Sequence, residues 1–136
     1  MARLVPKIYP LDVNEDIPIG LSFPLQMGTP RQNYITSKQV HTNLQNLILT
    51  MKGERPMQPE FGCDLYNLLF EPAEEGVLTT AAREAIENSI DLWMPEITIQ
   101  DVFVESQPEY NLIEISVMYT VEGWPAENTL NLKVKV

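Results

Sequence analysis

The sequence predicts an α+β fold of two layers, in which helices pack on a mainly antiparallel sheet of three or more C-terminal strands, with an extended N-terminal arm. Two observations carry this prediction. Apolar residues recur at helical spacing up to about residue 93, and after Pro95 the apolar period switches to two. The length of 136 residues, with 44% hydrophobic and 21% charged positions, suits one compact domain.

Prolines dominate the start of the chain. Residues 1–35 hold Pro6, Pro10, Pro18, Pro24 and Pro30 and show no helical period, which predicts an extended arm that lies on another surface. Only residues 19–23 look like a short strand within it. We therefore expect an arm over residues 1–35 and a single domain over residues 36–136.

Three helices are predicted between the arm and the strands. They cover about residues 37–50, 64–70 and 80–93, each with apolar side chains along one face. The residues expected to cap or stop them are Ser37 and Gly53 for the first, Asp64 and Pro72 for the second, and Thr79 or Thr80 and Pro95 for the third.

Three strands follow, separated by turns at residues 107–111 and 122–126, where Pro or Gly stands. The last strand, expected over residues 127–136, reaches the end of the sequence and is predicted at a sheet edge. Lys133 and Lys135 discourage uncontrolled pairing there. The edge is therefore either simply protected or kept free for a strand from a partner.

Charge excludes some classes of partner. The formal net charge is -10, and residues 57–132 carry Arg83 alone against fifteen acids, so nucleic-acid binding is not expected and a partly basic protein partner fits better. No apolar run approaches the roughly eighteen residues that a membrane span needs. The first residues also lack a signal peptide, so we expect no membrane association and folding in the cytoplasm.

Residues able to support catalysis are few. Cys63 and His41 are the only cysteine and histidine, which gives no disulfide, no metal site and no cofactor site, and Cys63 is expected to be a small buried side chain. His41 lies inside the first helix beside core residue Val40, so a catalytic role is not expected. Glu54 and Glu60 are the two carboxylates that a glycosidase reading would use, although neither spacing nor surroundings single them out.

The segment between the first two helices is the most distinctive in the sequence. It reads Gly53-Glu54-Arg55-Pro56-Met57-Gln58-Pro59-Glu60-Phe61-Gly62. Two prolines fix backbone angles and Gly62 permits a positive φ, so a rigid loop is predicted. Arg55 offers a planar fork of donors, Glu60 an acceptor and Phe61 an apolar anchor. Arg55 and Glu60 are expected either to pair within the loop or to contact a partner.

This loop carries a family resemblance. The run from Arg55 through Leu65, together with the amphipathic helix before it and the stretch Asn67-Leu68-Leu69-Phe70-Glu71-Pro72 after it, resembles the inner baseplate wedge subunits of contractile-tailed bacteriophages, which have relatives in type VI secretion baseplates. The resemblance covers roughly residues 35–136. Arg55, Pro59 and Glu60 match the Arg, Pro and Glu positions of the family.

The resemblance implies a structural subunit of the virion, assembled in the host cytoplasm into a sixfold ring of wedges. Arg55, Pro59, Glu60, Phe61 and Gly62 would hold the core-bundle helices of other wedge proteins. The edge strand would pair with arms of the first tail sheath ring and so start sheath assembly; its residues are Leu130, Leu132, Lys133, Val134, Lys135 and Val136. The tail tube and hub proteins are further candidate partners.

Two alternatives remain open at this stage. Some members of the family are labelled lysozymes, which keeps a peptidoglycan hydrolase using Glu54 and Glu60 as the runner-up. A free-standing regulatory or adaptor domain with the same fold is the third, because a fold alone does not fix the partner.

Overall fold

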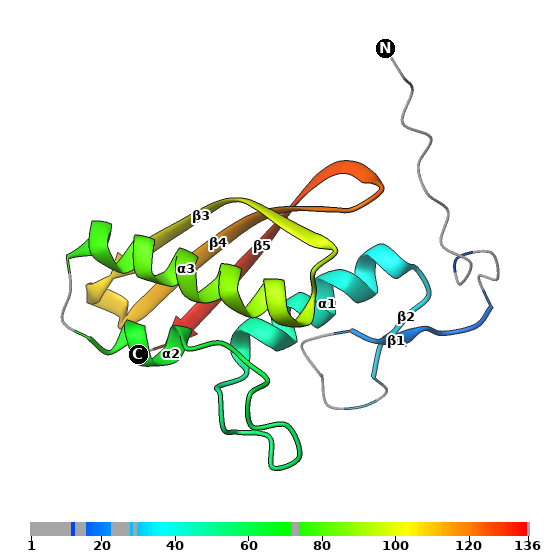
Figure 1. Cartoon of the computed structure of the whole chain (residues 1–136), viewed down its shortest axis with the longest axis horizontal. Coiled ribbons are helices and arrows are strands. Elements are labelled where there is room, and N and C mark those ends of the chain that lie inside the picture. The colour runs from blue at the N-terminus through cyan, green and yellow to red at the C-terminus, as the bar shows by residue number, and fades with distance from the viewer. Residues whose placement is uncertain (1–11, 13–15, 23–27, 29, 72–73, 136) are drawn as a thin grey trace.

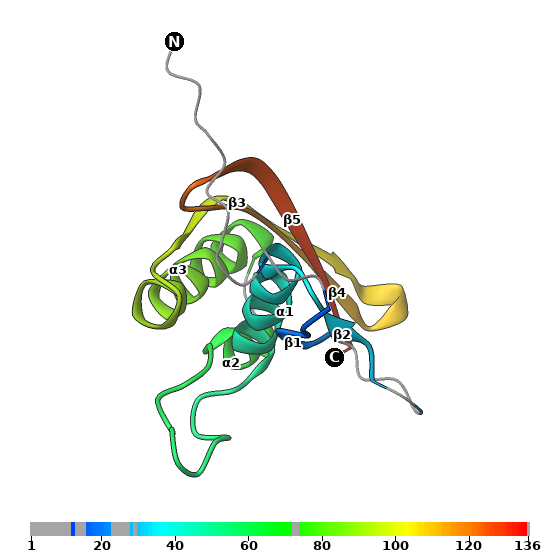
Figure 2. The ribbon, with the colours of Figure 1, turned by 90° about the vertical axis from the view of Figure 1, so that its right-hand side faces the viewer.

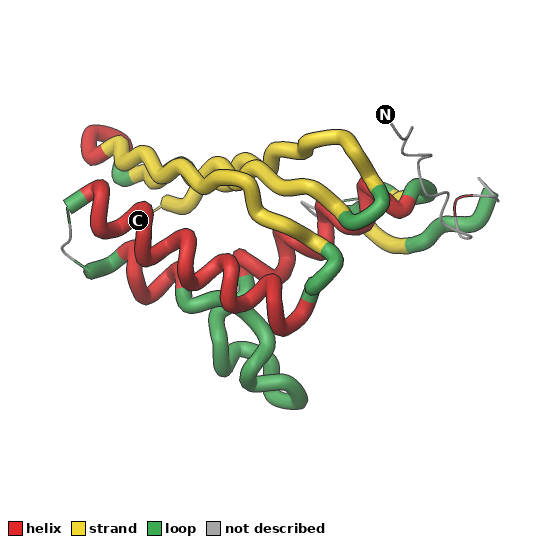
Figure 3. Tube along the Cα trace, turned by 45° about the horizontal axis from the view of Figure 1, so that its top comes forward, coloured by secondary structure: helices red, strands yellow, loops and turns green. Residues whose placement is uncertain are grey.

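The computed structural model describes residues 12, 16–22, 28, 30–71 and 74–135. Two helices and a shorter one lie against one face of a three-stranded antiparallel sheet, so the molecule has two layers (Figures 1 and 3). The α+β prediction is confirmed. None of the helices in the described part of the chain has the length and apolar character needed to span a membrane.

The first helix, α1, spans Thr36–Leu49 and begins one residue before the predicted start. Its buried face consists of Thr42, Leu44, Leu47 and Ile48, which follow the helical spacing of the sequence. The predicted cap at Ser37 is wrong, because Ile35 occupies the N-cap position and offers no side-chain acceptor. Instead, Oδ1 of Asp12 accepts hydrogen bonds from the backbone N–H and the hydroxyl of Thr36, both at 2.7 Å.

Asp12→Ala is expected to lower the free energy of unfolding by about 1 kcal/mol, because it leaves the N–H and the hydroxyl of Thr36 without their carboxylate acceptor. Ser37→Ala is the matched control and should change that free energy by less than about 0.5 kcal/mol. Urea denaturation of the two variants checks this. Equal effects would show that Asp12 does not cap α1.

Of the next two helices, the longer one differs more from the prediction. The short helix α2 spans Leu65–Leu69, as expected, with Asp64 at its N-cap position but without a capping hydrogen bond from the Asp64 side chain. The long helix α3 spans Glu75–Trp93 and starts five residues before the predicted 80. Thr79 and Thr80 therefore lie inside α3 rather than at its cap, and the Thr80 hydroxyl donates to the Gly76 carbonyl one turn back at 3.1 Å.

The sheet contains β3 (Ile97–Gln107), β4 (Leu112–Val121) and β5 (Trp124–Lys135), in that order. The three predicted strands are confirmed. The turn before β5 is tighter than expected, because Gly123 adopts a φ of 80° and β5 starts at residue 124 rather than 127. Inward-facing residues of β4 and β5 pack against α1, α2 and α3 to form the core.

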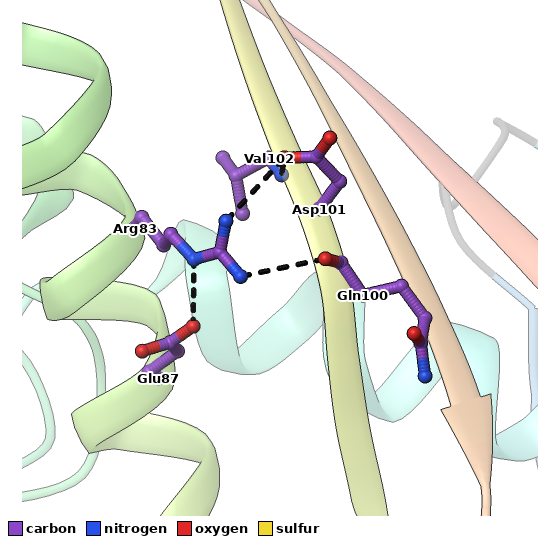
Figure 4. Close-up of polar contacts among 5 residues, drawn as sticks. All are labelled: Arg83, Glu87, Gln100, Asp101 and Val102. Atoms are coloured by element: carbon purple, nitrogen blue, oxygen red, sulfur yellow. Dashed lines mark hydrogen bonds and ion pairs between the residues drawn. The ribbon is translucent and has the colours of Figure 1, made fainter.

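The two outer strands of the sheet, β3 and β5, have different neighbours. Helix α3 packs along β3, and Arg83 reaches from α3 to a bulge in β3 after Ile99 (Figure 4). Its guanidinium contacts the Gln100 carbonyl and the Asp101 carboxylate, both at 3.4 Å, and Glu87 at 2.9 Å. Among the described residues, β5 pairs only with β4. Its other edge therefore carries backbone groups that pair with no described strand.

The segment before α1 packs on α1. Strands β1 (Gly20–Leu21) and β2 (Gln32–Asn33) form a small antiparallel hairpin at one end of α1 (Figures 1 and 2). The Asn33 side chain is 4% exposed, and its Nδ2 donates to the Leu21 carbonyl, the Gln39 side chain and the Thr42 hydroxyl. Most of the predicted arm, residues 1–11, 13–15, 23–27 and 29, lies outside the described residues, and the boundary at residue 35 remains a prediction.

Candidate docking loop and strand edge

The loop from Gly53 to Gly62 projects from the helical layer, on the side away from the sheet (Figures 1 and 3). Its two ends are joined by a parallel bridge between Met51 and Cys63 and by a hydrogen bond from the Cys63 N–H to the Thr50 carbonyl at 2.9 Å. A second bond closes the loop from the Gly53 N–H to the Pro59 carbonyl at 2.7 Å. The loop is therefore held at its base and again within its length.

Tight turns fill the rest of the loop. The N–H groups of Gln58 and Phe61 donate to the carbonyls of Arg55 and Gln58, at 3.2 and 3.1 Å. Oε2 of Glu54 accepts a bond from the Met51 N–H at 3.1 Å. These bonds leave the tip in solvent, where Met57 is 93% exposed. The rigid loop predicted from Pro56, Pro59 and Gly62 agrees with this pattern.

At Gly62 the end of the loop passes close to the backbone of Thr50 and Met51. The φ of Gly62 is +128°, and a Cβ built there would lie 2.4 Å from the Thr50 carbonyl oxygen. Its own carbonyl accepts a bond at 3.0 Å from the hydroxyl of Ser89, which is buried on α3. No side chain fits at this position, which places Gly62 in the architecture of the loop rather than on its surface.

Arg55 is oriented by aromatic rings. Its guanidinium carbon lies 3.9 Å from the centre of the Phe61 ring, and Phe61 packs edge to face on Trp93 of α3, with ring centres 5.1 Å apart. The Trp93 Nε1 is buried without a hydrogen-bond partner among the described residues, so packing alone holds the indole. The expected internal pair between Arg55 and Glu60 is absent from the described structure, where neither side chain forms an ion pair.

A pocket of about 320 Å³ opens beside this stack. It brings the loop together with α1 and the end of α3, and its lining residues are Asn43, Asn46, Leu47, Arg55, Phe61, Trp93, Met94 and Glu96. The helical spacing of Trp93 in the sequence indicated that its side chain faces the core. It did not indicate that the Trp93 ring packs against Phe61. The amides of α1 were missed, because nothing in their local sequence marks them.

A lysine at the base of the loop pairs with the residue before α2. The Lys52 ammonium lies 2.8 Å from the Asp64 carboxylate, and this hydrogen bond raises the pKa of Lys52 above its ordinary value. Asp64 thus bonds to Lys52 instead of capping α2. Both side chains are nearly half exposed, so the pair contributes little to stability.

The predicted strand-edge residues divide into two groups. Leu130, Leu132 and Val134 are each 2% exposed and belong to the core, so their side chains cannot contact a partner. Lys133 and Lys135 point outward, and Lys133 lies 3.7 Å from Glu114 on β4. Val136 lies outside the described residues. What β5 can offer a partner is therefore its backbone edge together with its outward side chains.

Glu54 and Glu60 are the two carboxylates of the glycosidase alternative. Glu54 and Glu60 are both exposed on the loop, and neither lines the three pockets described for this structure. Glu54 is engaged by the Met51 N–H. Neither carboxylate therefore lies in one of these pockets, whereas glycoside hydrolysis uses apolar surroundings to separate the roles of acid and base. Among the described residues, no group of three or more potential metal ligands forms a site.

Cys63 is buried in the core, and His41 is half-buried against β4. Cys63 is 1% exposed, and burial raises the pKa of its thiol. Nδ1 of His41 lies 2.9 Å from the hydroxyl of Tyr119 on β4. Burial lowers the pKa of His41 below 6.5 and raises that of Tyr119 to about 12, so near neutral pH both side chains are uncharged.

This pair makes stability depend on pH. Because the pKa of His41 is lower in the folded protein than in the unfolded chain, the unfolded chain binds more protons as pH falls below 6.5. The contribution of His41 to the free energy of unfolding is expected to be constant above that pH and to fall below it. His41→Gln, which lacks the titrating group, should remove this part of the slope in urea denaturation series. An unchanged slope would contradict the assignment.

Comparison with known proteins relates most of the chain to one family. The family model described as baseplate wedge protein gp25 matches residues 36–126. Baseplate wedge protein gp25 of Enterobacteria phage T4 is 38% identical over 60 residues, which are 44% of this chain and 45% of that protein. The chain thus matches less than half the length of this relative.

Solved structures share the fold. A protein described as a tail lysozyme from Geobacter sulfurreducens superposes with a TM-score of 0.65 at 18% identity, over 74% of this chain and 90% of its own. A chain of the type VI secretion system baseplate complex gives 0.55 at 18% identity, over 72% and 91%. A chain of the anti-feeding prophage baseplate gives 0.55 at 18% identity, over 85% and 82%.

Proposed function

This chain belongs to the baseplate wedge protein gp25 family, and from that premise we propose that it is a non-enzymatic structural subunit that joins the wedges of a contractile tail baseplate to the first ring of the sheath. Its place is the tail of the virion, in a sixfold ring built in the host cytoplasm. Baseplate complexes of a type VI secretion system and of the anti-feeding prophage contain chains of the same fold, which supports assembly with other baseplate proteins.

The proposed wedge contact rests on one observation, the way in which the loop holds the Arg55 guanidinium. One face of its guanidinium rests on Phe61, and its N–H groups make no hydrogen bond within the described part of the chain. A guanidinium oriented in advance loses less conformational entropy when it binds carboxylates or the carbonyls at a helix end. Glu60 is exposed and forms no ion pair with a described residue, and it supplies the complementary acceptor. We assign this pair to the core-bundle helices of the larger wedge proteins.

The edge of β5 supports the sheath contact. Backbone groups along a free edge can form the hydrogen bonds of a further strand, and Lys133 and Lys135 provide outward charges that select the partner. The loop and the sheet lie on opposite sides of the helical layer (Figure 3). A wedge protein and a sheath arm can therefore bind at the same time.

Hydrogen exchange of the subunit in stepwise assemblies tests both contacts. We expect amides of residues 53–62 to become protected when the subunit joins wedges, and amides of residues 124–135 to gain further protection only after sheath is added. The free subunit and the baseplate without sheath are the references. Protection of residues 124–135 that is the same before and after sheath addition would rule out the edge as the sheath contact.

A further inference from the structure

A polar pocket of about 280 Å³ lies between α1, the β1–β2 hairpin and the first half of β5. The residues that matter here are Asn33 from the hairpin, Lys38, His41, Thr42 and Gln45 from α1, and Asn128 from β5. The pocket lies far along the chain from the docking loop and shares none of its residues. The function proposed above does not account for it.

The charge of this pocket is opposite to that of the protein. The chain carries a formal net charge of -10, yet the described lining contains Lys38 and His41 and no carboxylate. The Lys38 side chain is exposed and forms no ion pair with a described residue. An ammonium group without a partner, surrounded by amides and hydroxyls, suits an anionic group.

The polar walls are already fixed. The Asn33 amide bonds three acceptors, and the Thr42 hydroxyl donates to the Lys38 carbonyl at 3.0 Å. Nδ1 of His41 lies 2.9 Å from the Tyr119 hydroxyl, so Nε2 is the ring nitrogen that stays available to a ligand. With a carboxylate in the pocket, Nε2 would carry the imidazole proton and donate to it. Lys38 and His41 are three residues apart, so they lie on the same face of α1.

The register of the sheet relates the pocket to the free edge. Asn128 on β5 is paired with Tyr119 on β4, whose buried side chain points to the helices. If a further strand paired with the free edge of β5, its residue opposite Asn128 would lie on the same face of the sheet as Asn128 and Tyr119. Its Cβ would be about 5 Å from that of Asn128, on the side away from β4. That side chain would enter the pocket lined by Lys38 and His41.

We propose that this pocket receives an aspartate or glutamate side chain from the extended partner segment that pairs with β5. The inference rests on the proposed strand addition and deepens it, because it specifies the charge of one residue of the partner. Backbone pairing along β5 would supply affinity, while the carboxylate on Lys38 and His41 would set the register of the added strand.

Short blocked peptides provide the test. Three acetylated and amidated peptides of alternating valine and threonine, with a central Glu, Gln or Lys, are titrated into the whole protein and followed by NMR of the β5 and α1 amides. The Glu peptide is expected to bind about three- to ten-fold more tightly than the Gln peptide, and the Lys peptide more weakly than either. The preference for Glu should shrink as salt rises.

Two matched variants locate the effect. Lys38→Gln should remove the preference for Glu over Gln, whereas Arg31→Gln, which removes one positive charge outside the pocket, should keep it. Shifts of β5 amides with equal affinity for the Glu and Gln peptides would overturn the carboxylate site and leave strand addition intact. No shift of β5 amides with any peptide would overturn strand addition itself, and the carboxylate site with it.

Discussion

Arg55→Ala is expected to give a folded subunit that no longer joins baseplate wedges. The substitution removes the guanidinium that lies 3.9 Å above Phe61 and thus the only fork of donors that the loop presents. Loss of a partly exposed contact between a cation and a ring costs about 0.5–1 kcal/mol, which a domain of this size tolerates. Loss of a hydrogen-bonded charge pair at a buried interface costs about 2–5 kcal/mol, or more than a ten-fold loss of affinity. Co-purification with the wedge proteins measures it.

Arg55→Lys is the matched variant, because it keeps the positive charge and removes the planar fork. If bidentate bonding is what holds the wedge, the lysine variant should be impaired nearly as much as the alanine variant. Circular dichroism and urea denaturation should show both variants folded. Normal incorporation of folded Arg55→Ala protein would refute the assignment of Arg55 to the wedge contact.

Gly62→Ala is expected to have the largest effect on stability, with a loss of about 3 kcal/mol or more in the free energy of unfolding. The added Cβ would lie 2.4 Å from the Thr50 carbonyl oxygen and 3.0 Å from the Met51 carbonyl carbon, which are backbone atoms that cannot rotate away. The residue would also have to keep a φ of +128°. Thermal and urea denaturation measure the loss.

Two other glycines separate the causes of that loss. Gly53 has a φ of +87° but no atom within 4 Å of the Cβ position, so Gly53→Ala should cost only the conformational term of about 1 kcal/mol. Gly76 lies in the first turn of α3 with open space around it, and Gly76→Ala should be neutral or stabilising. Equal losses for Gly62→Ala and Gly53→Ala would show that the clash with Thr50 is not what matters.

Periodicity predicted the elements whose apolar faces are complete in sequence. The spacing of Leu44, Leu47 and Ile48 identified α1, and the alternation through Ile113, Ile115 and Val117 identified β4, because burial imposes those periods directly. Helix starts were less predictable. Asp12 is 24 residues away from the Thr36 that it caps, and a local search for a capping residue cannot find such a partner.

In the loop, too, the features set by local sequence were predictable and the features set by packing were not. Pro56, Pro59 and Gly62 indicated a rigid turn because each restricts its own backbone, and that restriction is local. The seat of Arg55 on Phe61 and of Phe61 on Trp93 depends on how α3 packs beside α1, which no local pattern contains. On β5, by contrast, the burial of Leu130, Leu132 and Val134 follows from their alternation in the sequence.

The shape of the molecule suits a connector. The docking loop extends from one side of the helical layer and the sheet covers the other (Figures 1 and 3). Helices α1 and α3 join these two sides through a shared core, so the loop and the edge of β5 are held at a fixed separation. Six copies in a ring would present six loops to the wedges and six strand edges to the sheath, and such repetition strengthens contacts that are individually modest.

An electron cryomicroscopy reconstruction of a baseplate assembled from this chain tests the central claim most directly. We expect the loop from Gly53 to Gly62 to be buried against helices of the larger wedge proteins, with Arg55 and Glu60 in contact with them and Met57 no longer in solvent. A reconstruction in which this loop faces solvent while the subunit is held through another surface would contradict the account.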